Sequence, residues 1–179
     1  KTMAWLAHQF TNMIDANGAA VFDSIIMVTD RIVLNRNMAE DVVNFETTLG
    51  TVMDIRKRSK TLADALNGKN RIIISTVQKF AYALDYLKHE QQKRYAVIID
   101  EAHTAVGNEA AKDLVNALST QEDLAQIEDY NPDDYESPLD ALMAQQQNYR
   151  KMMKHISYFA FTATPKDKTY ALYGKDGKE

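Results

Sequence analysis

Apolar residues along the chain follow two different spacings. Steps of three and four residues predict helices, while short continuous β-branched runs predict strands that are buried on both faces. Helical spacing covers residues 3–15, 34–49, 62–66, 80–87 and 109–118, and strand-like runs cover 24–29, 71–76, 95–100 and 156–162. Because helices alternate with buried strands, the pattern predicts one α/β domain, with a parallel sheet covered by helices on both faces.

One segment interrupts this alternation. Residues 119–149 hold eight Asp or Glu residues and no Lys or Arg, and two of the three prolines lie there. We therefore expect an acidic insertion over residues 119–150, partly a solvated loop, whose last part returns as a helix. The basic run at 56–60, RKRSK, fits a solvated turn better than a DNA contact.

The composition sets broad limits on the class of protein. The 179 residues, 45% of them hydrophobic, suffice for one domain with a buried core. The absence of cysteine excludes disulfides and thiolate metal sites and favours a reducing cytoplasm. No apolar run approaches the length of a membrane span, and no signal peptide is recognisable. Because the net charge is −4, the chain has no overall positive field, and nucleic acid could bind only at local basic sites.

Two adjacent acids, Asp100 and Glu101, end the expected strand at 95–100. Ligands of open parallel sheets bind beyond the carboxyl ends of the strands, so both carboxylates are expected at an edge that water reaches. A hydrated Mg²⁺ that carries nucleotide phosphates is the natural positive partner, since this ion prefers one or two carboxylates plus phosphate and water. The same pair is also typical of an ordinary polar turn, so it does not define a site alone.

Four segments at expected strand ends resemble the motifs of superfamily-2 DEAH-type helicases and translocases. They are IMVTDRIVLNRN (26–37), IIISTVQKF (72–80), VIIDEAH (97–103) and FAFTATP (159–165). Together with AWLAH near the start and TPKDKTYALYG near the end, the set is similar to the motor part of the R (restriction) subunit of type I restriction enzymes.

The resemblance implies a RecA-like motor domain of the P-loop NTPase class that uses ATP and Mg²⁺. At the matching positions, Asp100 would bind Mg²⁺ through water and Glu101 would be the catalytic base. His103 would relay the nucleotide state to Thr162 and Thr164, which would couple hydrolysis to movement.

The resemblance also implies a track for double-stranded DNA. Residues that would line it, mainly through phosphate contacts, are Asp30, Arg31, Thr76, Gln78 and Lys79. The parent enzyme would be an ATP-dependent type I site-specific deoxyribonuclease of a bacterial or archaeal cytoplasm, with modification and specificity subunits as partners. Another superfamily-2 DNA helicase and a non-hydrolysing scaffold of the same fold stay open as alternatives. A nicotinamide-binding Rossmann domain is excluded, because no GxGxxG follows a strand.

The sequence departs from the family at the phosphate loop, since it contains no GxxxxGK[ST]. Lys1 and Thr2 fit positions at the edge of this loop, and whether Lys1 is the loop lysine itself stays open. Because the loop supplies the groups that cradle the phosphates, we expect the polypeptide alone neither to bind ATP tightly nor to hydrolyse it. In this fold a strand leads into the phosphate loop. We expect its position in the sheet to be filled by another segment, by a partner chain (a second copy or another protein), or by collapse of the sheet.

Overall fold

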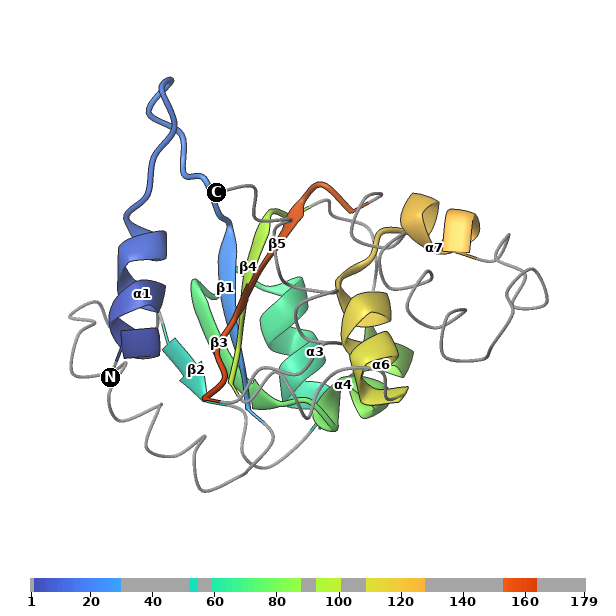
Figure 1. Cartoon of the computed structure of the whole chain (residues 1–179). Coiled ribbons are helices and arrows are strands. Elements are labelled where there is room, and N and C mark those ends of the chain that lie inside the picture. The colour runs from blue at the N-terminus through green and yellow to red at the C-terminus, as the bar shows by residue number, and fades with distance from the viewer. Residues whose placement is uncertain are drawn as a thin grey trace, which may run out of the picture.

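A five-stranded parallel sheet lies at the centre of the computed structural model (Figure 1). The structure describes residues 2–29, 52–54, 59–87, 93–100, 109–127 and 153–163. The strands, in the spatial order β2-β3-β1-β4-β5, are β1 (Ser24–Thr29), β2 (Val52–Asp54), β3 (Ile72–Thr76), β4 (Tyr95–Ile99) and β5 (Ile156–Ala160). Every pairing is parallel, so the strands share one carboxyl edge, at the bottom of Figure 1.

Helices cover both faces of the sheet, as the sequence predicts. On one face, α1 (Thr2–Thr11) packs against β1 and β4. The other face carries α3 (Ser59–Asn67), α4 (Lys79–Ala83) with its 3-10 continuation η1 (Leu84–Tyr86), and α6 (Glu109–Leu118). The helix α7 (Gln121–Ile127) follows α6 along the chain. The predicted parallel α/β class is thus confirmed.

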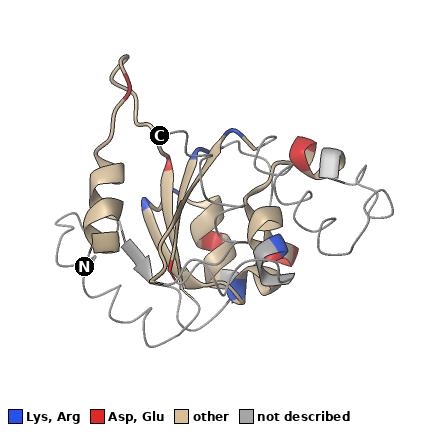
Figure 2. Ribbon diagram, in the orientation of Figure 1, with Lys and Arg blue, Asp and Glu red and all other residues tan. Residues whose placement is uncertain are grey.

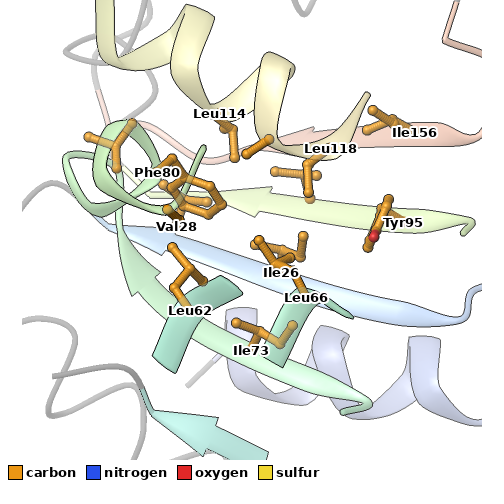
Figure 3. Packing of buried hydrophobic residues seen from close by; sticks show 14 of the residues in the cluster. Ile26, Val28, Leu62, Leu66, Ile73, Phe80, Tyr95, Leu114, Leu118 and Ile156 are labelled. Carbon is orange, nitrogen blue, oxygen red and sulfur yellow. The ribbon is translucent and has the colours of Figure 1, made fainter. Parts of the chain in front are cut away.

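The core consists of two apolar layers, one on each side of the sheet. Figure 3 shows the larger layer, in which Leu62, Phe80 and Leu114 reach from the helices onto Ile26 and Val28 of β1. The residues between these on the strand face α1 instead. Because both faces are covered, β1, β3 and β4 are buried along their whole length, which explains their continuous apolar runs.

The predicted helix over residues 3–15 is wrong at its C-terminal end, because α1 stops at Thr11. The Thr11 hydroxyl and the Asn12 side-chain amide both donate to the carbonyl oxygen of His8. The Arg71 guanidinium donates to the carbonyl oxygen of Thr11. These contacts satisfy carbonyl groups that a helix end leaves without a helical partner.

A tight turn follows α1 and projects beyond the sheet at the top of Figure 1. The Asp15 carboxylate accepts hydrogen bonds from the backbone amides of Asn17 and Ala19, at 2.8 and 2.9 Å. Gly18 adopts a φ of +79°, which a residue with a side chain rarely tolerates. This turn at Asp15, Asn17 and Gly18 prevents the helix that the spacing of the surrounding apolar residues predicts.

Two described elements were not predicted, β2 and α7. The three residues of β2 form too short a run for a periodicity argument. The helix α7 lies in the expected acidic insertion and begins with a reciprocal cap, in which the Thr120 hydroxyl accepts from the Asp123 amide and the Asp123 carboxylate accepts from the Thr120 amide. The rest of that insertion, from residue 128 to 150, and the predicted helix at 34–49 lie outside the described residues.

Basic residues lie at the amino ends of β3 and β4, on the edge opposite to the carboxyl ends (Figure 2). The Lys93 ammonium donates to the carbonyl oxygens of Leu66 and Gly68, at the C-terminal end of α3, where a helix dipole favours a cation. Burial lowers the pKa of Lys93, although the charge of Asp23 opposes this shift. Arg94 pairs with Asp23 at 3.2 Å. These residues hold the amino ends of the strands and the end of α3 together.

None of the helices in the described parts of the chain has the length and hydropathy that crossing a bilayer requires.

Candidate nucleotide and nucleic-acid edge

The chain segments that leave β4 and β5 are held side by side at the carboxyl edge. The amide of Asp100 donates to the carbonyl oxygen of Val28 at 2.9 Å, and the amide of Phe161 donates to the carbonyl oxygen of Ile99 at 2.8 Å. The sheet register therefore continues one residue past each strand. Asp100 lies between the end of β1 and Phe161, and Thr162 follows directly.

On the sheet face that α1 covers, polar side chains lie at the carboxyl ends of β3, β1 and β4. Thr29 pairs with Thr76 in the register, and because Val28 pairs with Ile99, Asp100 lies next to Thr29 on the other side. The Thr29 and Thr76 side chains are 0% and 4% exposed, whereas Asp100 is half-buried. One buried hydroxyl group, that of Thr29, thus lies on the strand next to the carboxylate that the sequence singled out, and Thr76 lies one strand farther away.

Thr29 is the residue of this row to which sequence reasoning gave no role. The signal was the threonine that closes the otherwise apolar run SIIMVT, in the same way as Asp100 closes the run of β4. Its place beside Asp100 depends on the strand order, which periodicity alone does not give.

The N-terminus of α1 points to the same edge. Its C-terminal residue Thr11 is bound by Arg71, which precedes β3, so this end of the helix lies at the amino edge of the sheet. The helix of 10 residues is about 15 Å long and runs against the strands, which carries the exposed Thr2 to the carboxyl edge (Figure 1). A helix N-terminus has a partial positive charge that suits phosphate groups. Lys1 lies outside the described residues.

Of the residues expected at the nucleotide, the structure describes Asp100 and Thr162 at the ends of neighbouring strands, where Phe161 lies beside Asp100 in the register and Thr162 is the next residue. Thr162 is half-buried. Glu101, His103 and Thr164 lie outside the described residues.

The residues expected at the DNA divide by exposure. Gln78 is exposed and Lys79 half-buried at the start of α4, directly after β3. The Thr76 side chain is buried within the sheet, so it is not accessible for a phosphate contact. Asp30 and Arg31 lie outside the described residues. Of the residues expected at the DNA, Gln78 and Lys79 are thus the ones that solvent reaches in the described part of the chain.

The polar groups at this edge suit a Mg²⁺ ion that has few protein ligands. In the described part of the chain, no group of three or more His, Cys, Asp and Glu residues could hold a metal ion by itself. A single half-buried carboxylate, Asp100, instead fits a hydrated Mg²⁺ whose other ligands are phosphate oxygens and water.

Comparisons with known proteins match the chain to an ATPase family. A family model described as SWI2/SNF2 ATPase matches residues 1–176. No curated protein sequence matches the chain. One similar solved structure is that of Mss116p (NTE and C-tail double deletion) bound to ssRNA and AMP-PNP, with 13% sequence identity and a TM-score of 0.49. That match covers 93% of this chain and 30% of the other.

Proposed function

The chain belongs to the SWI2/SNF2 ATPase family, and from that membership we propose that it is the motor part of the R subunit of a type I restriction enzyme. In this proposal the parent enzyme couples ATP hydrolysis to translocation along double-stranded DNA before cleavage. The combination of the motifs IIISTVQKF, VIIDEAH and FAFTATP with AWLAH near the start and TPKDKTYALYG near the end supports the restriction subunit over the family at large.

The observation that carries the proposal is the adjacency of Asp100 and Thr162 at the carboxyl edge, with the N-terminus of α1 at the same edge. Mg²⁺, when bound with ATP, would neutralise phosphate charge and orient the γ-phosphate. Asp100 would hold the ion through water, with its carboxylate beside the buried hydroxyl of Thr29. Glu101 would accept the proton of the attacking water.

Movement would begin at the neighbouring strand end. Phe161 lies beside Asp100 and Thr162 follows it directly, so a change at the nucleotide would reach Thr162 through the neighbouring strand end. His103 would carry the same signal to Thr164. Gln78 and Lys79 leave β3 at the same edge and would contact DNA phosphates, as would Asp30 and Arg31; such contacts position the protein without reading sequence.

Two alternatives keep the same fold. Another superfamily-2 helicase would use these residues to separate strands, and a non-hydrolysing scaffold would need neither Asp100 nor Thr162. The carboxylate and the threonine on adjacent strand ends favour a nucleotide-driven motor over the scaffold.

A triplex-displacement assay tests the proposal and separates these alternatives. The assay would use the protein in which this chain follows a GxxxxGK[ST] segment, assembled with modification and specificity subunits. The substrate is a long DNA duplex that bears a third strand at a distance from the assembly site. We expect ATP-dependent release of the third strand, with a lag that grows with its distance, and an intact duplex. Strand separation would favour the helicase instead. Absence of both ATP turnover and release would favour the scaffold.

A further inference from the structure

Tyr82 is the most exposed large apolar side chain of the described residues, at 68%. It lies on α4, whose Phe80 and Ala83 are fully buried against the core. Contacts with α3 on one side and α6 on the other make α4 the middle helix of this layer. Tyr82 therefore projects outward from the middle of the layer.

Tyr82 shares its helical face with Gln78. Gln78 has helical backbone angles and precedes Tyr82 by four residues, so the two side chains are neighbours on the helix surface. Side chains on a helix tilt towards its N-terminus. The Tyr82 ring therefore leans back towards Gln78 and the carboxyl edge of the sheet.

Tyr86 provides a comparison on the same helical layer. It is 53% exposed, but it lies one further turn along, about 6 Å farther from the edge. Its carbonyl oxygen accepts a hydrogen bond from the Asn67 side chain at 3.1 Å, at the C-terminal end of α3. Tyr86 thus belongs to the opposite half of the layer.

Charge along this surface changes sign in the same direction. Lys79 lies at the start of α4, near the edge, whereas the exposed Asp85 lies beside Tyr86. Asp64 is exposed on the neighbouring helix α3. A phosphate backbone is attracted near Lys79 and repelled farther along, so its contact would end within the first turn of α4.

We propose that the Tyr82 hydroxyl donates a hydrogen bond to a backbone phosphate of DNA, one helical turn beyond Gln78. Tyrosine is among the side chains that make such phosphate contacts. The inference rests on the proposed function, because it extends the DNA track at the carboxyl edge. A neutral donor adds affinity without releasing counterions, so it leaves the salt dependence of binding unchanged.

The test is the affinity of the chain for a fluorescent DNA duplex over a series of salt concentrations. We expect Tyr82→Phe to weaken binding about tenfold, as loss of a hydrogen bond to a charged group does, with an unchanged salt slope. Tyr86→Phe, the matched control, keeps the wild-type affinity. Lys79→Ala lowers the slope of log affinity against log salt by about 0.9. Thermal melting of each variant verifies that it is folded.

Each result has one reading. Duplex binding by the wild type with an equal affinity of Tyr82→Phe would overturn the inference and leave the proposed function intact. A loss in Tyr82→Ala but not in Tyr82→Phe would also overturn it, since the ring rather than the hydroxyl would make the contact. An equal loss in Tyr86→Phe would show a general surface effect and overturn it too. No duplex binding by the wild type, even at low salt, would remove the DNA part of the proposed function together with this inference.

Discussion

Glu101→Gln is expected to lower ATP turnover about 10²- to 10⁴-fold in the motor that carries this chain after its phosphate loop, the range for loss of a general base. The amide keeps the size of the carboxylate but accepts no proton from the attacking water. Nucleotide affinity should change little, because the phosphates and Asp100 would still hold the metal ion in the proposed site. Phosphate release measures turnover, and equilibrium titration with a fluorescent ATP analogue measures binding.

A matched carboxylate variant controls for charge. Asp64→Asn removes an exposed acid on α3, away from the carboxyl ends of β4 and β5, and should keep wild-type turnover. Turnover within twofold of wild type in Glu101→Gln would remove Glu101 from the role of base. An equal loss in Asp64→Asn would show that the overall charge, not the site, sets the rate.

The titration of Tyr95 is expected to cost the folded state about 2 kcal/mol of stability as the pH rises from 10 to 12. Burial, aided by the charge of Asp23, raises the pKa of Tyr95 from 10.0 to about 12. In this window the unfolded chain has released the phenol proton and the folded chain has kept it. Stability that is fully present below pH 10 is therefore lost as the pH rises through the folded pKa.

Urea unfolding at a series of pH values measures this loss. Tyr95→Phe should flatten the dependence between pH 10 and 12, because the ring stays in the core and the titrating group is gone. Tyr86→Phe, at an exposed position of η1, should keep the wild-type dependence. An unchanged slope in Tyr95→Phe would show that another group causes the alkaline loss.

Much of the fold follows from periodicity in this sequence. The run at 24–29 and the helix at 109–118 have the predicted bounds, because continuous burial and amphipathic spacing are both strong there. The end of α1 was not predictable in this way. Three side chains compete with continuation of the helix there. Two are local, Thr11 and Asn12, and the third, Arg71, lies 60 residues farther along the chain. Such contacts depend on tertiary structure and leave no periodic signal.

The candidate site follows from the sequence only in part. The acid at the end of β4 and the threonine after β5 could be predicted to lie at the same edge, since parallel strands share a carboxyl edge. The order of the strands could not, and that order sets Thr29 between Thr76 and Asp100. The burial of Thr76 is a second consequence that the motif alone did not give, and it leaves Gln78 and Lys79 as the described DNA candidates.

In the proposed motor, the metal–nucleotide complex binds where β4 and β5 end. Iron-mediated backbone cleavage tests it most directly: Fe²⁺ replaces Mg²⁺ with bound nucleotide in the motor that includes the phosphate loop, peroxide is added, and the cut sites are mapped by mass spectrometry. We expect nucleotide-dependent cuts next to Asp100 and Thr162 that Asp100→Asn abolishes. Cuts at the opposite edge, near Arg94 and His155, would contradict it.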